Sequence, residues 1–482
     1  MRIPFPKSIP FRPLFGVLTV TLLIQLVQGT DPVFAVLMLA AQLAAVAAFN
    51  RLGGMTHMAG AFCLFAVLPN VTVPELAHLV LGQPGDYSLE HPLATAGACA
   101  VFFLGMLSAA LLASLTRPAQ PYIDRIHFSI LELRIASAIA CVVSAGIVFA
   151  LVNTPERVED GSFLAVLIHF YVFLLVSSIM LATYVRLKVT NGRSAMSWYI
   201  AFLLGLALVP GILGASTEGI LSPIVSWLVV VAASRHRFSR LGTLVVFGCM
   251  LFVWNFAYPF SHDARSPIRE AATISEKVTI FVDYVRDPSQ FPNTNENSGE
   301  SGQFGTAKVN VVERFSLLKP IDMLIDADQK VGYTSFARYA PVFLAVVPHV
   351  LWPNRPAPIT SNELGHKAGF RMNENDTSTG IAIGSPALFF DLGGWLALAV
   401  YSIFSFSIFF YMTRRIIGTT DAGVWALVPI GAEAHIAGAS SPATIFFAFF
   451  MFLANFFVTV AILKMVSYVS QSLISNPVSS GA

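Results

Sequence analysis

The sequence predicts an all-α, polytopic integral membrane protein with about twelve transmembrane helices and one large extracytoplasmic loop that contains amphipathic and re-entrant helices. Three observations lead to this fold class: the composition, the recurrence of long apolar runs, and a one-sided distribution of basic residues. Of the 482 residues, 55% are hydrophobic and only 12% are charged, whereas a soluble domain carries about 25% charged residues. This composition excludes a soluble enzyme, a disordered chain and a nucleic-acid-binding protein with a basic surface.

Apolar runs of roughly 17–25 residues are long enough to cross a bilayer as helices. Twelve such runs lie at 13–29, 32–49, 55–70, 92–115, 131–152, 163–185, 195–214, 217–234, 241–258, 388–412, 422–439 and 443–463. The first run is not a cleaved signal peptide, because it lacks a small-residue cleavage site and Asp31-Pro32 leads directly into the second run. The four cysteines all fall inside apolar runs, so neither a disulfide framework nor a zinc site is indicated.

The basic residues predict the orientation of the spans. The segments on one side of the runs carry fifteen Lys and Arg residues. The short segments on the other side carry one, Arg157, among acidic residues that include Glu75. Because positive charge marks the cytoplasmic side of a membrane protein, both termini are expected in the cytoplasm.

One segment departs from the pattern of short connections. The spans divide the chain into transmembrane helices 1–9 over residues 1–258, a large loop over 259–380, and helices 10–12 with a cytoplasmic tail over 381–482. The loop holds 12 basic and 14 acidic residues and is expected on the outer side. A connection of this length in a compact protein is usually functional or disordered, so we expect the binding and catalytic residues here.

Two amphipathic helices are expected inside the loop. The first has Ser266 as its N-cap and Pro267 at its first helical position, and it ends before Pro288. Its apolar residues recur at spacings of three and four, which predicts a helix on the membrane surface or across the bundle. The second spans about 308–329 and is interrupted by Pro320.

The last part of the loop, 330–371, is basic. It contains Lys330, Arg338, Arg355, Lys367 and Arg371 against a single acid, Glu363, and adds two histidines. Arginine guanidinium groups pair two phosphate oxygens at once, and this pairing strengthens where water is excluded. A lipid diphosphate is therefore the expected ligand. The alternative is that these arginines pair with lipid headgroups or with nearby glutamates.

A short apolar helix is predicted in the middle of this basic stretch. Pro341 can start a helix and Pro348 would break it, so the segment between them is too short to span a bilayer. We expect a re-entrant or interfacial half-helix, with Arg338 at one end and the turn at 349–355 at the other.

Four short segments resemble those of a known family. They are PHVLWPNRP at 348–356, NELG at 362–365, TG at 379–380 and FDLG at 390–393. Together with the long outer loop before the last spans, this pattern resembles the Wzy-type polymerases, which are bacterial integral-membrane polymerases of O-antigen and exopolysaccharide repeat units. The motif covers about 314–394, and the similarity in topology covers the whole chain.

The resemblance implies a reaction at the periplasmic face of the bacterial inner membrane. A glycan on undecaprenyl diphosphate is transferred to the end of a new lipid-linked repeat unit. The resemblance also implies that Arg338, Arg355 and Arg371 bind the diphosphate or the glycan, with Arg314 as a further candidate.

By the same resemblance, His349 is the expected base that takes the proton of the acceptor hydroxyl, with Glu363 as an assisting group. His366 is a weaker candidate for the base or for glycan binding. The alternative interpretation of His349 is a side chain that caps the half-helix or bonds a carbonyl. Where the family has a polar or acidic residue before the last long span, this chain has Ser385-Pro386. Asp391 either replaces that polar residue or lies at the solvent-exposed end of a span.

The expected partners are the lipid bilayer, the undecaprenyl-diphosphate-linked oligosaccharide, a chain-length regulator and export machinery, but no nucleic acid. No cofactor or metal is expected, since the chain lacks a Walker-type phosphate loop. Glu433 and His435 lie in the eleventh apolar run and, being two residues apart, point to different faces of a helix. The two interpretations are a buried pairing and a contact to the glycan. The alternative functions are an O-antigen ligase, a polysaccharide flippase or transporter, and a non-catalytic scaffold.

Overall fold

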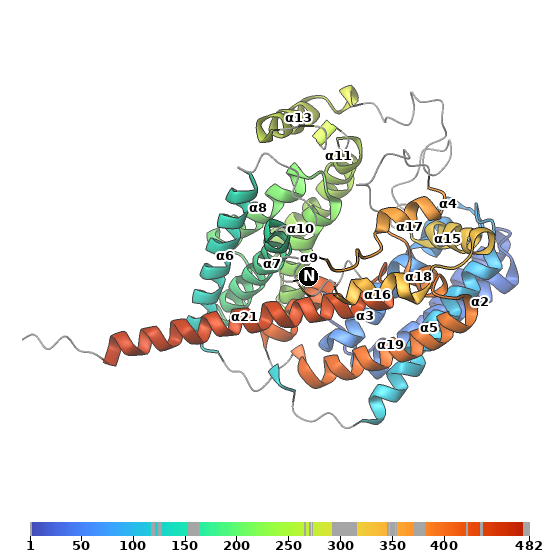
Figure 1. Cartoon of the computed structure of the whole chain (residues 1–482), viewed down its shortest axis with the longest axis horizontal. Helices are drawn as coiled ribbons and strands as arrows, with labels where there is room; N and C mark the ends of the chain where they lie inside the picture. Colours follow the sequence, from blue (N-terminus) through green and yellow to red (C-terminus); the bar gives the residue numbers. More distant parts are fainter. Residues whose placement is uncertain are drawn as a thin grey trace, which may run out of the picture.

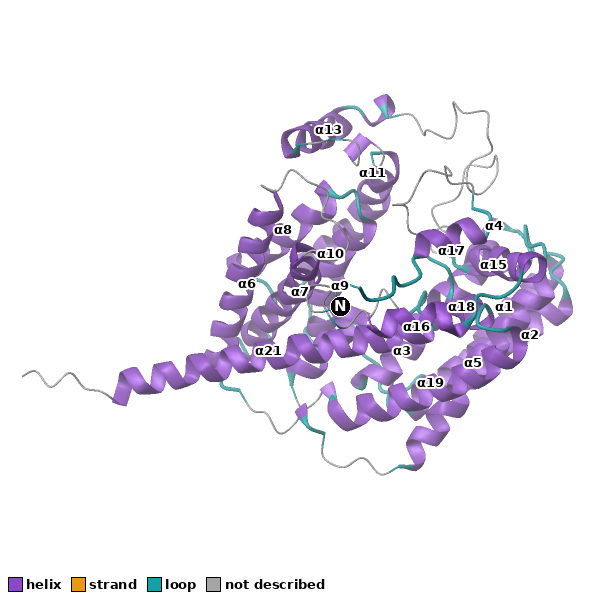
Figure 2. Cartoon of the chain, in the orientation of Figure 1, coloured by secondary structure: helices purple, strands orange, loops and turns teal. Residues whose placement is uncertain are grey.

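The computed structural model describes residues 2–116, 121–123, 128–152, 163–264, 267–268, 271, 273–291, 316–344, 347, 352, 354–370, 381–420, 423–433 and 437–475. Over these residues the chain is helical, and backbone pairing outside helices is limited to two isolated bridges, Arg2 with Arg237 and His57 with Thr419 (Figure 2). The prediction of an all-α fold is therefore confirmed. The helices form two groups that lie side by side, and α21 (Pro442–Ser475) runs across both (Figure 1).

The first group contains the N-terminal helices and one helix from the C-terminal part. Its members are α1 (Phe11–Val27), α2 (Pro32–Arg51), η1 (Gly54–Thr56), α3 (Met58–Val67), η2 (Leu68–Thr72), α4 (Val73–Leu81), α5 (Pro92–Leu115) and α19 (Gly394–Ile416). The Asp31 carboxylate caps α2 by accepting from the backbone N–H groups of Val33 and Phe34. Small residues allow the helices to approach closely: a Cβ on Gly105 of α5 would lie 2.0 Å from the Ser402 Oγ of α19.

The second group follows in sequence. Its members are α6 (Ile130–Val152), α7 (Phe163–Val189), α8 (Trp198–Leu213), α9 (Thr217–Ala233), α10 (Arg240–Phe252), η4 (Val253–Ala257), α11 (Tyr258–Asp263), α13 (Ile274–Arg286) and η5 (Pro288–Gln290). The helices α11 and α13 share a small separate core in which Phe260 and Tyr284 are buried. Two later elements, η7 (Val424–Ala426) and α20 (Val428–Glu433), lie between the groups, and α20 contacts α3, α7 and α9.

The remaining helices of the predicted loop cover one end of the first group. They are α15 (Leu318–Val331), α16 (Phe336–Leu344) and α17 (Ser361–Lys367), and the short helix α18 (Ser385–Phe390) packs against α15, α5 and α19 (Figure 1). The loop therefore has an ordered C-terminal part that is anchored to the bundle rather than detached from it.

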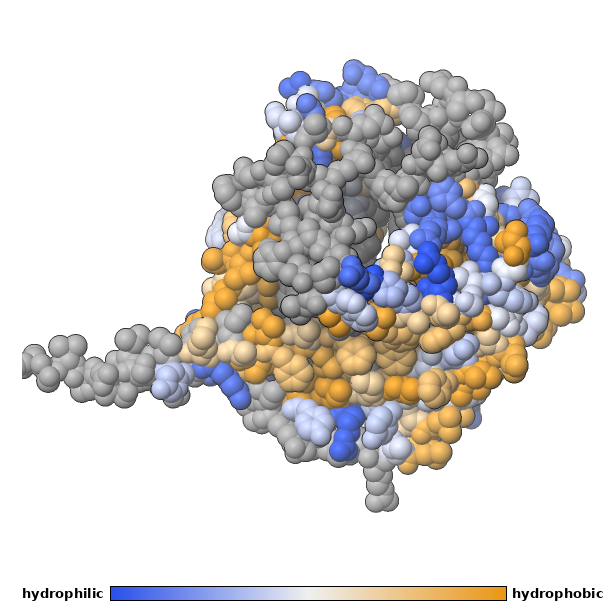
Figure 3. Space-filling view, in the orientation of Figure 1, coloured by the Kyte–Doolittle hydropathy of each residue, from blue (hydrophilic) through white to orange (hydrophobic). Residues whose placement is uncertain are grey.

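Six helical runs in the described part of the chain are long and apolar enough to cross a membrane. They are Pro32–Arg51, Met58–Leu81, Pro92–Leu115, Ile130–Ile147, Gly394–Ile416 and Pro442–Ala461. Each overlaps one of the predicted spans, and three shorter apolar helices, Phe11–Val27, Trp198–Leu213 and Gly219–Ala233, match three more. The molecular surface shows a hydrophobic band, with hydrophilic residues gathered over α15 and α17 on one side of it (Figure 3).

Three of the predicted spans differ from the structure. The run at 55–70 continues through a π-helical turn to Leu81, so Glu75 lies inside a helix and not in a short loop. The predicted helix over 422–439 is not continuous: its described part is a 3₁₀ turn and the six-residue α20. The span predicted from 388 begins at Gly394, because Gly393 and Gly394 adopt positive φ angles of 146° and 76° that break the helix after α18.

The predicted loop helices also need correction. The helix described in this region begins at Ile274, where Thr273 and Glu276 form a capping box, and it ends before Pro288 as predicted. The predicted N-cap, Ser266, lies outside the described residues. Pro320 does not interrupt the second helix, because it lies in the first turn of α15, where its missing N–H costs no helical hydrogen bond. The half-helix α16 contains Pro341 instead of starting there.

Candidate functional site

The structure brings two of the predicted site residues together. The Arg338 Nη2 of α16 lies 2.7 Å from the Glu363 Oε2 of α17, and both side chains are close to half exposed. Thr360 caps α17 by accepting from the Glu363 N–H, and this capping places the Glu363 carboxylate in the first turn, facing α16. The pair therefore presents a guanidinium and a carboxylate to solvent at the polar end of the first group.

The other predicted residues are more dispersed. Arg355 Nη1 donates to the Val347 carbonyl at 2.7 Å, and His366 lies in the last turn of α17. Arg314, His349 and Arg371 lie outside the described residues, as does His435.

A buried charge cluster lies directly beside this pair. Lys367, at the end of α17, places its Nζ 2.5 Å from Asp391 Oδ1 and 2.7 Å from Asp328 Oδ1, and it also donates to the Thr334 hydroxyl. Asp391 and Asp328 are almost completely buried, whereas the Lys367 side chain remains 17% exposed. One ammonium group thus joins α17, α15 and the turn after α18.

The two carboxylates of the cluster differ in their partners. Asp391 accepts hydrogen bonds on both oxygens, from the Thr334 N–H and Lys367 on Oδ1 and from the Tyr339 hydroxyl on Oδ2. Asp328 Oδ1 faces only the Lys367 ammonium, outside hydrogen-bond geometry, and Asp328 Oδ2 has no hydrogen-bond partner among the described residues. Asp391 is therefore surrounded by hydrogen-bond donors, and Asp328 is not.

This difference determines the charge of the cluster. Burial, together with the nearby Asp391 carboxylate, raises the pKa of Asp328 to about 8. Burial alone would lower the pKa of Lys367, but its close contacts with the two carboxylates outweigh that effect and raise it. The raised pKa values of Asp328 and Lys367 favour a protonated Asp328 carboxyl beside a charged Lys367 ammonium at neutral pH. Burial and the Asp391 charge also raise the pKa of Tyr339, which stays a hydrogen-bond donor.

A pH-dependent stability follows from the pKa of Asp328. The folded protein holds this proton up to about pH 8, whereas the unfolded chain loses it near the ordinary value of 3.8. Stability should therefore fall as the pH rises from 4 to 8, by up to about 5 kcal/mol. Asp328→Asn should remove this fall and be the more stable form at pH 9, as measured by thermal unfolding in detergent.

Asp326→Asn is the matched control. The hydrogen bond from Lys330 lowers the pKa of Asp326, so this carboxyl titrates below the range from pH 4 to 8. If the pH dependence of Asp328→Asn equals that of the wild type, Asp328 is ionised in the folded protein.

The opposite face of α15 anchors the helix to α5. Asp322 is buried and accepts from the backbone N–H groups of Glu90 and His91 and from the Thr95 hydroxyl. Asp326 adds a contact of 2.9 Å to the His91 ring. Asp326 and Asp328 form an Asp-x-Asp sequence, yet their side chains contact different partners. Among the described residues, no three His, Cys, Asp or Glu side chains come together as a metal site would require.

A pocket of about 390 Å³ opens next to the charged pair. Its described lining comes from α16, α17, the segment before α18 and the start of α21. The residues are Tyr339, Val342, Ile359, Ser361, Leu364, Ile381, Ala382, Ile383, Leu388, Ala439, Ser441 and Thr444. Tyr339 belongs both to this wall and to the buried cluster, so the cluster fixes the position of one wall of the pocket.

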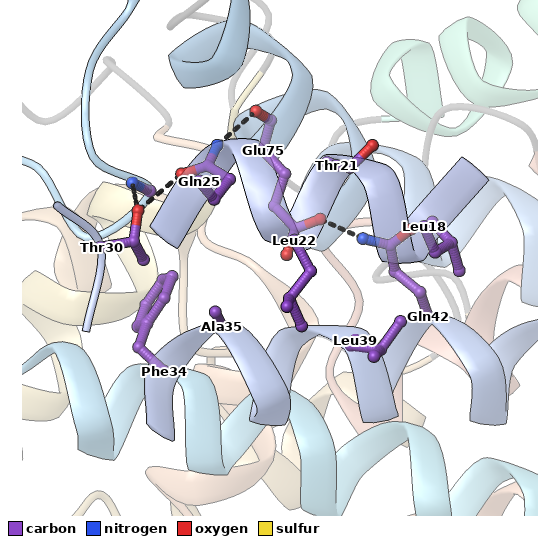
Figure 4. Close-up of a pocket in the computed structure, with 11 residues that line it drawn as sticks. Leu18, Thr21, Leu22, Gln25, Thr30, Phe34, Ala35, Leu39, Gln42 and Glu75 are labelled. Carbon is purple, nitrogen blue, oxygen red and sulfur yellow. Dashed lines mark hydrogen bonds between the residues drawn. The ribbon is translucent and has the colours of Figure 1, made fainter. Parts of the chain in front are cut away.

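A second polar group lies among the apolar helices of the first group. Gln42 on α2 donates to the Glu75 carboxylate on α4, and Gln25 on α1 donates to the Glu75 carbonyl at 3.1 Å (Figure 4). Thr30 links this network to the next loop through Gln25 and the Gly85 N–H. A carboxylate that packs inside an apolar helical run carries a cost and invites a functional interpretation.

Sequence reasoning missed the centre of this site. No sequence motif contains Asp328, Thr334 or Tyr339. Lys367 enters the sequence analysis only as one of the basic residues of the stretch at 330–371. The available signal was Asp328 among the apolar residues of an amphipathic helix, since a carboxylate on the buried face of a helix needs a partner.

Comparison with family models, with curated proteins and with solved structures finds no match to this chain. The function must therefore be inferred from the residues and the geometry of this site.

Proposed function

We propose that the chain is an inner-membrane glycosyltransferase that polymerises undecaprenyl-diphosphate-linked oligosaccharide repeat units at the periplasmic face. In this proposal the apolar runs cross the membrane, the run at 422–439 as an interrupted helix, the termini are cytoplasmic, and the loop at 259–380 is periplasmic. One observation carries the proposal: an Arg–Glu pair lies next in sequence to two residues that line a pocket, Tyr339 and Leu364, in a chain with helices long and apolar enough to cross a membrane.

The arginine side chains provide the binding chemistry. Arg338 is paired with a single carboxylate at 2.7 Å and is 47% exposed, so an incoming diphosphate can replace Glu363. Two phosphate oxygens match the guanidinium fork better than one carboxylate oxygen does. Arg355 donates to the Val347 carbonyl at 2.7 Å, and it is the second arginine proposed to contact the diphosphate.

The same exchange supplies a base for the acceptor hydroxyl. Once the diphosphate takes the guanidinium, Glu363 is released next to the reacting groups and can accept the hydroxyl proton. Glu363, or His349 as first expected, would then remove the proton while Arg338 stabilises the leaving diphosphate.

A second candidate function is a flippase or transporter of the same lipid-linked sugar. The Glu75–Gln42 contact inside an apolar helical run favours this alternative, because transporters place ionisable groups among their helices. An O-antigen ligase would share the arginine chemistry and differ only in its acceptor. A chain-length regulator and export machinery would be the protein partners of the polymerase.

The test is an analysis of lipid-linked sugars in a strain that lacks the chain. A polymerase leaves single repeats on the outer leaflet, whereas a flippase leaves them on the inner leaflet. In the complemented strain, Arg338→Ala should reduce polymer at least about 100-fold at normal protein level, with partial recovery in Arg338→Lys. Lys330→Ala, a basic and exposed residue at the same end, is the matched control and should make normal polymer. Full-length polysaccharide from Arg338→Ala would contradict the diphosphate assignment.

A further inference from the structure

The pocket beside the Arg338–Glu363 pair has a chemistry of its own. Its volume of about 390 Å³ lies within the range of small-molecule sites, which runs from about 300 to 1,000 Å³. Arg338 and Glu363 are the chain neighbours of two lining residues, Tyr339 and Leu364, on the same two helices. A ligand whose charged group contacts Arg338 can therefore extend into the pocket.

None of the described residues that line the pocket carries a formal charge. The lining has four hydroxyl groups, from Tyr339, Ser361, Ser441 and Thr444, and is otherwise aliphatic or backbone. A phosphate or a uronic acid in this pocket would lose its hydration without gaining a cation, which is costly. The ligand that enters is therefore uncharged.

The hydroxyl groups also argue against a simple hydrocarbon ligand. Ser441 Oγ and Thr444 Oγ1 lie 2.9 Å apart, and Ser441 Oγ also accepts from the Thr444 N–H. Whichever of the two hydroxyls donates to the other, one O–H remains available for a ligand. Against an isoprenoid chain this donor would stay unpaired, whereas a sugar hydroxyl would satisfy it.

One wall of the pocket is rigid. The Tyr339 hydroxyl donates to Asp391 at 2.8 Å, and Asp391 is in turn held by Lys367 and the Thr334 N–H. The ring is therefore fixed by the buried cluster, and a preorganised wall discriminates between ligands of similar size.

We propose that this pocket binds the uncharged sugar unit next to the lipid diphosphate and so selects the repeat unit by its hydroxyl groups. The inference rests on the proposed function. It adds that the sugar is recognised apart from the diphosphate, by Ser361, Ser441 and Thr444 against the fixed Tyr339 ring.

Cysteine protection tests the proposal on the full-length chain in detergent. Ser361→Cys and Thr444→Cys are each introduced with Cys249→Ser, since Cys249 is the exposed native cysteine and Cys63, Cys99 and Cys141 are buried. The rate of maleimide labelling is measured with undecaprenyl diphosphate alone and with the same lipid carrying its oligosaccharide repeat. Ser275→Cys, on the exposed face of α13, is the control position.

At about ten times its Kd, the sugar-bearing lipid should slow labelling of both pocket cysteines about tenfold. The bare lipid diphosphate should leave both rates unchanged, and Ser275→Cys should react equally in all cases. Equal protection by the bare lipid would make this a lipid pocket, and absence of protection would mean that no sugar enters; either result overturns the inference. If the deletion strain accumulates single repeats while protection is absent, only this inference fails, and the proposed function stands.

Discussion

Replacing Lys367 by methionine is expected to lower the free energy of unfolding by about 3–5 kcal/mol. The Lys367 ammonium is the only cation that the described structure places against Asp328 and Asp391, both of which are buried. Methionine keeps most of the side-chain volume and removes the charge, so Asp391 becomes a buried carboxylate without a counter-ion. Thermal unfolding in detergent, followed by tryptophan fluorescence, measures the loss.

Lys330→Met is the matched control for this variant. Lys330 also pairs with an aspartate, at 2.6 Å from Asp326, but its side chain is 66% exposed. A surface pair of this kind contributes roughly 0–1 kcal/mol. If the two substitutions lower the free energy of unfolding equally, Lys367 does not balance the charge of a buried carboxylate. The double variant Asp391→Asn with Lys367→Met should be less destabilised than the sum of the two single variants, because it removes both buried charges together.

Long apolar runs were read correctly from the sequence because a spanning helix depends on local composition alone. The run at 92–115 corresponds to α5 residue for residue, and no information about distant residues was needed to find it. The same local reasoning failed at 422–439, where Gly423 has a positive φ of 153° and Pro429 stands in the first turn of the short helix α20, in a run that is apolar enough to span. The total hydropathy of a run does not show where its helix is interrupted.

The candidate site was less accessible for a different reason. Arg338 and Glu363 were selected for their charge in an apolar chain, and the structure brings these two side chains together. The cluster at Lys367 depends on contacts between residues 24 and 52 positions apart in sequence, such as Tyr339 with Asp391. A sequence pattern shows that a buried aspartate needs a partner, but the fold decides which partner it meets.

The docking of the loop onto the bundle should depend on Asp322. Asp322→Ala is expected to destabilise the protein by about 3–4 kcal/mol, because it leaves three donors without an acceptor. These donors are the N–H groups of Glu90 and His91, at 2.8 and 2.9 Å from the carboxylate, and the buried Thr95 hydroxyl at 3.0 Å. They surround the N-terminus of α5, where the helix dipole also favours a negative charge.

Asp326→Ala, one turn further along α15, is the control for Asp322→Ala. Asp326 contacts only the half-exposed His91 ring and the exposed Lys330, so its loss should cost about 1 kcal/mol or less. Proteolysis provides a second measurement. At a protease concentration that leaves Asp326→Ala intact, Asp322→Ala should be cleaved within 316–344. If both variants unfold and are cleaved alike, α15 is held by its apolar face, and the Asp322 cap is not what joins the loop to the membrane helices. If only Asp322→Ala loosens the segment, the position of Arg338 depends on a carboxylate that lies outside the site itself.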